Sequence, residues 1–133
     1  MIKRWTHETS GQGLYEITEE VRRQVQRADI DQGLCTLFLR HTSASLVIQE
    51  NAAPSARRDL ENWMNRLVKE NDPIYTHTAE GPDDMPAHIK AALTQTSLAI
   101  PIDDGEMVLG TWQGIFLWEH RQAPKRRELV VHL

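Results

Sequence analysis

Near its C-terminus the chain reads Gly110-Thr111-Trp112-Gln113-Gly114-Ile115-Phe116-Leu117-Trp118-Glu119-His120-Arg121, and this stretch decides the fold. The four apolar residues at 115–118 predict a short strand buried on both faces, because a half-exposed strand would alternate apolar with polar residues. Side chains alternate along a strand, so Glu119 and His120 should point to opposite faces, with Arg121 on the side of Glu119. Sites often lie where buried strands emerge, although such a triplet is more often ordinary surface.

Length and composition predict one globular domain over residues 1–133, with 40% hydrophobic and 26% charged residues. A net charge of -4 disfavours nucleic acid as a partner. The single cysteine, Cys35, excludes an internal disulfide and a cysteine-rich zinc site, and a buried, inert thiol is expected. No apolar run approaches the ~20 residues that cross a bilayer, and the N-terminus lacks a signal-peptide core. We therefore expect a cytoplasmic protein without membrane contact.

The rest of the chain predicts an α+β fold, with a mostly antiparallel sheet and two to three helices. The predicted strands are an extended segment over 2–15 broken at 10–13, two strand halves within 34–48, a strand at 97–102, its return at 106–109 after a turn at 103–105, and a closing strand at 125–133. Three helices are predicted. The first starts at Thr18 and ends before Gly33, the second runs from Pro54 to Glu70, and the third starts at Pro86. The strand spacing at the end of the chain predicts an antiparallel meander.

Several side chains have expected structural roles in these helices. Thr18 should be the N-cap of the first helix, since its hydroxyl can accept a bond from a free amide of the first turn. Asn71 can close the second helix in a left-handed conformation. Apolar residues at helical spacing predict a buried face on each of the other two helices. These residues are Ala56, Leu60, Trp63, Met64, Leu67 and Val68 on the second helix, and Ile89, Ala92 and Leu93 on the third.

Histidines and acids near the predicted element ends form a candidate site. The histidines are His41, His77, His88 and His120, and the accompanying side chains are Glu50, Asn51, Asp59, Glu80, Asp84 and Glu119. Imidazole with carboxylate suits zinc or another divalent ion, whereas carboxylate alone suits magnesium. No pair has the His-Glu-x-x-His spacing, so the local metal signal is weak and hydrogen-bonded core histidines remain the alternative.

Other chemistries can be compared on neighbouring residues. Ser43 beside His41 suggests a nucleophile, but the Gly-x-Ser-x-Gly elbow is absent and a serine hydrolase is disfavoured. There is no P-loop and no Gly-x-Gly-x-x-Gly. Arginines and the amides of the turn before the buried strand could instead bind phosphate groups. The candidates for that role are Arg40, Arg57, Arg58, Arg121 and the 111–114 stretch.

Three blocks of the chain match one family in order and together span nearly its whole length. They are His41-Thr42-Ser43-Ala44-Ser45-Leu46 through Glu50-Asn51, Glu80-Gly81-Pro82-Asp83-Asp84-Met85-Pro86-Ala87-His88-Ile89-Lys90, and Gly110-Thr111-Trp112-Gln113-Gly114-Ile115 through Glu119-His120-Arg121. The chain thus resembles the YjbQ family, also called UPF0047, of small bacterial and archaeal proteins. The resemblance implies an α+β fold that assembles as a homotrimer, with sites near subunit boundaries, and a secondary thiamine-phosphate synthase activity.

That reaction joins the pyrimidine of hydroxymethylpyrimidine diphosphate to thiazole phosphate and releases pyrophosphate. The resemblance therefore implies a divalent metal, magnesium or zinc, and a small phosphorylated molecule as partner. The candidate catalytic residues are His41, His88, His120 and Glu119; the candidate metal ligands are the same three histidines, with Glu50, Asp59, Glu80 and Asp84 as alternatives; and the candidate phosphate-binding residues are Arg58, Arg121, Ser43, Thr111 and Gln113. The alternative is a metal- or small-ligand-binding protein, or a metal-dependent hydrolase, whose synthase activity is incidental.

Overall fold

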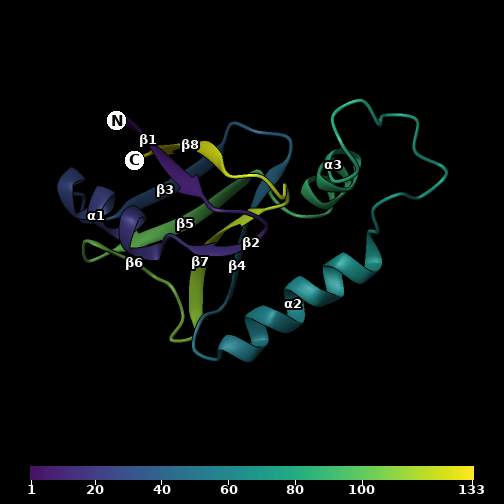
Figure 1. Ribbon diagram of the computed structural model, residues 1–133. Coiled ribbons are helices and arrows are strands. Elements are labelled where there is room, and N and C mark those ends of the chain that lie inside the picture. The colour runs from purple at the N-terminus through teal and green to yellow at the C-terminus, as the bar shows by residue number, and fades with distance from the viewer.

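Two antiparallel sheets and three helices make up the computed structural model, which describes residues 1–133 (Figure 1). The five-stranded sheet has the order β1-β8-β3-β5-β6, and the three-stranded sheet has the order β2-β7-β4. The strands are β1 (Ile2–Thr9), β2 (Gly13–Glu16), β3 (Gly33–Leu39), β4 (Ala44–Glu50), β5 (Ser97–Asp103), β6 (Glu106–Met107), β7 (Gln113–Glu119) and β8 (Lys125–His132). The helices are α1 (Thr18–Ala28), α2 (Pro54–Leu67) and α3 (Asp84–Leu93). The predicted α+β class is confirmed.

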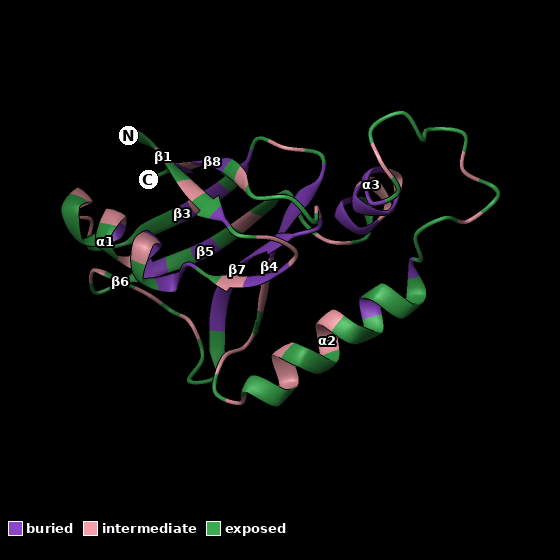
Figure 2. Ribbon diagram, in the orientation of Figure 1, coloured by how far each residue is buried: buried purple, intermediate pink, exposed green.

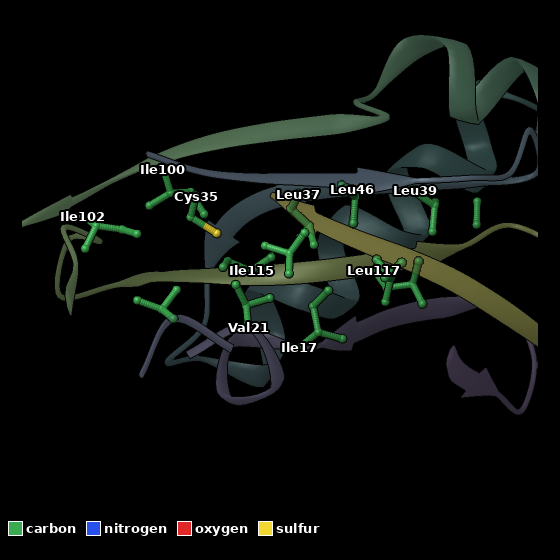
Figure 3. Packing of buried hydrophobic residues seen from close by; sticks show 14 residues of the cluster. Ile17, Val21, Cys35, Leu37, Leu39, Leu46, Ile100, Ile102, Ile115 and Leu117 are labelled. Atoms are coloured by element: carbon green, nitrogen blue, oxygen red, sulfur yellow. The ribbon is translucent and has the colours of Figure 1, made fainter. Parts of the chain in front are cut away.

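The main core lies where the two sheets and α1 pack together. Ile115 and Leu117 of β7 lie among Leu37 and Cys35 of β3 and Val21 of α1, and all five residues are fully buried (Figure 3). Burying a large aliphatic side chain of this kind contributes about 1.5–3 kcal/mol. Burial also raises the pKa of the Cys35 thiol to about 11, so the thiol is inert, as predicted.

The other face of the three-stranded sheet packs against α2. Phe116 and Trp118 of β7 meet Leu14 of β2 together with Met64 of α2 and Val68, the residue that follows the helix. β7 is therefore buried on both faces, which accounts for its unbroken apolar run and confirms that prediction.

Thr18 does not have the predicted role of an N-cap. It is the first residue of α1, and no side chain caps this helix. Its hydroxyl donates to Glu16 Oε2 at 2.8 Å and accepts a bond from the Ile115 amide at 2.9 Å. Thr18 thus ties the start of α1 to β7 instead of to an amide of its own first turn.

The predicted buried face of α2 is wrong at two large residues. Trp63 and Leu67 are 53% and 55% exposed, because α2 meets the sheet along the side that carries Leu60 and Met64 (Figure 2). The helix also ends at Leu67 rather than Glu70. Asn71 does adopt a left-handed conformation, with φ of 60°, but in the turn that follows the helix.

α3 begins at Asp84, two residues before the predicted start, and buries a different face. The buried residues are Asp84, Pro86, Ala87, Lys90 and Ala91, whereas Ala92 and Leu93 are exposed and Ile89 is half-buried. Two alanines on the buried face let the helix approach closely, and the alkyl chain of a lysine can cover apolar surface. The apolar spacing of this short segment was therefore a poor guide to its orientation.

The predicted turn at the end of β5 is confirmed, but the predicted meander is wrong. Asp104 and Gly105 form a two-residue turn with φ of 51° and 76°, typical of a type I′ hairpin. The return strand β6 then ends at Met107 instead of Leu109. β7 pairs with β2 and β4 in the other sheet, and β8 lies between β1 and β3. None of the three helices is long and apolar enough to cross a membrane.

Candidate metal centre

Asp84, the first residue of α3, is the centre of a cluster of two imidazoles and one carboxylate. Its Oδ2 atom lies 2.8 Å from His77 Nε2 and 3.1 Å from His88 Nε2. His88 is one helical turn after Asp84, so both side chains lie on the same face of α3. His77 comes from the loop that joins α2 to α3. The possible ligand atoms of the three residues all lie within 4.8 Å of one another, close enough to share one metal ion.

The hydrogen bond on the far side of His88 determines what its Nε2 atom can do. Nδ1 lies 2.8 Å from the carbonyl oxygen of Thr42, and a carbonyl only accepts, so Nδ1 carries the hydrogen. In the neutral ring Nε2 then directs a lone pair at the carboxylate of Asp84. Two acceptors at 3.1 Å repel each other unless a proton or a metal ion lies between them. Metal-bound histidines have the same arrangement, with the second ring nitrogen bonded to a carbonyl or carboxylate.

Arg121 holds the carboxylates at the start of α3 in place. Its Nε donates to Asp83 Oδ2 at 3.0 Å, Nη1 donates to Asp84 Oδ1 at 2.8 Å, and Nη2 donates to the Glu80 carbonyl at 3.1 Å. Oδ1 of Asp84 is thereby engaged, and Oδ2 is left to the two imidazoles. Burial acts to raise the pKa of Asp84, but the hydrogen bond from His77, the charge that His88 carries when its ring is protonated, and the charge of Arg121 outweigh it and hold that pKa below its usual value. The carboxylate is therefore ionised, as a metal ligand must be.

Two hollows flank the cluster. His77 lines one of about 450 Å³ formed by the loop before α3, together with Tyr75 and Met85. His88 lines another of about 470 Å³, together with His41. Since both imidazoles contact Asp84 and their ring centres are 5.6 Å apart, a small molecule in either hollow would lie beside the cluster.

His41 is a wall of the second hollow rather than a member of the cluster. Nε2 of the neutral ring accepts a hydrogen bond from the Glu128 amide at 2.8 Å, and its Nδ1 lies 3.4 Å from Nη1 of Arg127. Nε2 is thus engaged by an amide and Nδ1 faces a cationic side chain, so neither nitrogen is open to a metal. Burial, with a smaller effect from the charge of Arg127, lowers the pKa of His41 and favours this neutral form.

Glu119 and His120 bond to different partners, both away from the cluster. Glu119 is fully buried and forms an ion pair with Arg127, and its Oε1 also accepts a bond from Thr9 at 2.7 Å. His120 Nε2 bonds to the buried hydroxyl of Ser45 at 2.8 Å. Burial lowers the pKa of His120 to about 3, so this imidazole is neutral at physiological pH.

The Glu119–Arg127 ion pair nevertheless reaches the cluster through the backbone before β4. Arg127 Nη2 donates to the carbonyl and the hydroxyl of Ser43 at 3.2 and 2.9 Å. The preceding carbonyl, that of Thr42, is the one that orients His88. Arg127 is thus a positioning residue for the cluster, and sequence reasoning did not select it because the link runs through backbone atoms.

The structure places the other candidates outside the cluster. Oε2 of Glu50 accepts bonds from the amides of Ala52 and Ala53 at the start of α2. Arg58 and Asp59 are exposed in the first turns of α2, and Figure 1 shows this end of the helix far from α3. Thr111 and Gln113 are exposed beside Trp112, and Gln113 Oε1 accepts a bond from the Gly110 amide. Glu80 lies nearest to the cluster: its carbonyl accepts a bond from Arg121, and its side chain is one of the groups that lower the pKa of Asp84.

His77 is the member of the cluster that the candidate list lacked. It stood among the four histidines near element ends, but its loop has no periodicity that would have shown where the ring points. The spacing of four between Asp84 and His88 was a usable signal, because it places two side chains on one helix face.

Fold and site together define a class: a small α+β protein with two antiparallel sheets whose helix start carries the donor set of a divalent-cation site. The family model for the UPF0047 protein YjbQ-like family matches residues 3–133. The chain belongs to this family.

Individual relatives and solved structures agree with that assignment. The chain is 53% identical to a UPF0047 protein of Synechocystis sp. over 125 residues, which are 94% of this chain and 85% of the relative. It is 40% identical to the UPF0047 protein YjbQ of Escherichia coli O157:H7 over 132 residues, 98% of this chain and 95% of the relative. A crystal structure of a YjbQ/UPF0047 family protein from Clostridium acetobutylicum matches with a TM-score of 0.90, 33% identity and 98% coverage of both chains. A conserved hypothetical protein from Thermus thermophilus matches with a TM-score of 0.88, also at 33% identity and 98% coverage of both chains.

Proposed function

We propose that the protein binds a divalent cation through His77, Asp84 and His88 and uses it to act on a small phosphorylated molecule. The observation that carries this proposal is the 3.1 Å contact between His88 Nε2 and Asp84 Oδ2, two atoms that need a proton or a metal ion between them because the hydrogen of Nδ1 is donated to the Thr42 carbonyl. Two imidazoles, one carboxylate and an open position form the ligand set of many catalytic zinc sites. A bound cation would supply a Lewis acid for a phosphoryl or carbonyl oxygen.

The surrounding residues would orient the ligands and the substrate. Arg121 keeps Asp84 in place, and Thr42 fixes the ring of His88. The arginine has its Nε and both Nη atoms bonded already, so phosphate recognition would depend on the cation more than on this guanidinium. Within the hollow beside His88, the hydroxyl-bearing Thr42 and Thr96 and the neutral His41 can contact a substrate. Hydrolysis of a small phosphorylated substrate is the reaction that this arrangement supports best.

Thiamine-phosphate synthesis is the second candidate. Two observations favour it: membership of the UPF0047 family, and a hollow on each side of the cluster, since a condensation must hold two substrates at once. In that case the cation would bind the diphosphate that leaves. Assembly as a homotrimer and a cytoplasmic location belong to the same proposal.

Calorimetric titration of chelator-treated protein with Zn²⁺ and with Mg²⁺ tests the binding step. We expect saturable binding that His77→Gln and His88→Gln weaken at least about tenfold. The His77 side chain is 51% exposed, so its replacement should leave the fold intact. His132→Gln, which removes an exposed imidazole on β8, is the matched control. Equal affinities in all four proteins would refute the site.

Activity assays then separate the two reactions. Phosphate release from p-nitrophenyl phosphate, and thiamine-phosphate formation from the two precursors, should be measured with and without the bound metal. Metal-dependent phosphate release that fails in His77→Gln and His88→Gln supports the hydrolase. Metal-dependent synthase activity that fails in the same variants supports the synthase. Synthase activity that persists in both variants would place that reaction outside this cluster.

A further inference from the structure

A third hollow, which is polar and has a volume of about 210 Å³, lies between α2 and the strands β2 and β7. None of its lining residues belongs to the metal centre. It is lined by Gln12, Gly13, Glu61, Asn62, Asn65 and Trp118. We propose that this hollow binds the cationic amidinium or ammonium group of a small organic molecule.

Glu61 supplies the charge that such a group requires. Its Oε2 accepts a hydrogen bond from the Leu14 amide at 3.0 Å, which fixes the direction of the carboxylate. A Cβ on Gly13 would lie only 2.6 Å from this Oε2, so the missing side chain at position 13 is what lets the carboxylate reach the backbone. Glu61 takes part in none of the ion pairs of the chain. A fixed, half-buried carboxylate without a cation favours a cationic ligand.

Two amide side chains that line the hollow, those of Asn65 and Gln12, are also held in place by hydrogen bonds. Asn65 Oδ1 accepts a bond from the buried Lys90 ammonium at 2.6 Å, and Asn65 Nδ2 donates to Gln12 Oε1 at 3.3 Å. Gln12 in turn donates to the His120 carbonyl at 3.3 Å. The Lys90 ammonium donates to Asn65 and forms no ion pair with Glu61. Two of the wall's amides therefore already have partners, and the carboxylate is left as the charged group that a ligand can neutralise.

Trp118 and the size of the hollow narrow the class of ligand. The indole is one wall, and an organic cation is attracted to an aromatic ring as well as to a carboxylate. The volume of about 210 Å³ has room for a group of a few heavy atoms. A planar amidinium can place two N–H groups on one carboxylate, the fork geometry that makes such pairs strong.

Acetamidinium is the probe, and its binding to the whole chain is followed by ¹⁵N-resolved NMR. We expect saturable shifts of the Leu14 amide and the Trp118 indole N–H. Acetamide, which has the same shape without the charge, should give none. Glu61→Gln keeps an acceptor for Leu14 but removes the charge, so it should weaken binding at least about tenfold, the effect of a charge-assisted hydrogen bond.

Glu8→Gln is the charge-matched control, because Glu8 is an exposed residue of β1 whose contact with Arg126 lies outside the hollow. It should bind acetamidinium like the unaltered protein. Equal melting temperatures of the two variants would show that loss of binding is not loss of fold. Three results would each overturn the proposal: no saturable shift, an equal response to acetamide, or an unchanged affinity in Glu61→Gln.

Discussion

Replacing Glu119 with glutamine should lower both the stability of the fold and the affinity of the metal centre for its cation. The carboxylate is fully buried, its Oε1 accepts a bond from Arg127 Nε at 2.8 Å, and the Arg127 side chain is only 5% exposed. Glu119→Gln leaves the guanidinium without its counter-charge in an interior site, and breaking a buried pair in this way costs about 3–5 kcal/mol. For a domain of this size that corresponds to a melting temperature lower by roughly 11–18 °C.

Calorimetric melting and urea unfolding at pH 7 would measure the change. Glu8→Gln is the control: it removes an equal charge from a pair with Arg126 in which both side chains are 76% exposed, and such pairs contribute less than about 1 kcal/mol. Replacing both buried partners, as Glu119→Met with Arg127→Met, should recover part of the loss because no unpaired charge remains. If Glu119→Gln and Glu8→Gln melt at the same temperature, the reasoning about the buried pair is wrong.

The same variant tests the link to the metal centre. Arg127 holds Ser43, and the neighbouring Thr42 carbonyl orients His88. Disturbing a partner of a metal ligand usually lowers metal affinity by about 10–100-fold. We therefore expect a loss of that size in zinc affinity for Glu119→Gln at a temperature well below its melting transition. An unchanged affinity would show that the ion pair serves the fold alone.

Three further predictions concern other parts of the molecule. Burial lowers the pKa of His120 to about 3, below its ordinary 6.5, so the unfolded chain binds the extra proton between these values and stability is lost as pH falls from 6.5 to 3. His120→Gln should flatten that dependence, as urea unfolding at several pH values would show, and an unchanged slope would contradict it. Gly114→Ala should lower the free energy of unfolding, measured in urea, by about 1–3 kcal/mol, because its Cβ would lie 2.7 Å from Glu16 Oε2. An unaltered urea midpoint would mean that the neighbouring side chains move aside freely. Met64→Ala should lower the free energy of unfolding by about 2–5 kcal/mol because Met64 is buried, and Trp63→Ala should lower it by at most about 0.5 kcal/mol because Trp63 is exposed. Equal losses in thermal melts would contradict the exposed position of Trp63.

The fold could be predicted where local sequence carried the information. The apolar run of β7 had to be buried on both faces, and the Asp104–Gly105 turn has the residues that a two-residue hairpin requires. The order of strands could not be read in the same way. Insertion of β8 between β1 and β3 depends on contacts between distant segments, which no local pattern encodes.

The exposed side of α2 is a second case where periodicity was not enough. Trp63 and Met64 follow each other in the sequence and are equally apolar, yet only Met64 faces the sheet. Helical spacing shows that a stripe exists, but its width against the sheet depends on how the helix is docked.

For the candidate site, the sequence supplied the residue types and the structure supplied their partners. Asp84 and His88 share a helix face by spacing alone. His77 reaches them through a loop without periodicity, and His120 looked similar in sequence but bonds to Ser45 in the interior. Loop geometry and burial, which depend on the whole fold, made that distinction.

A titration with cobalt(II), followed by visible absorption, tests most directly whether His77, Asp84 and His88 hold a metal together. With nitrogen and oxygen ligands in place, a d–d band should grow and saturate at one equivalent in the unaltered protein, and it should be absent in His88→Gln. A band of equal intensity in both proteins, or no saturating band at all, would contradict the account.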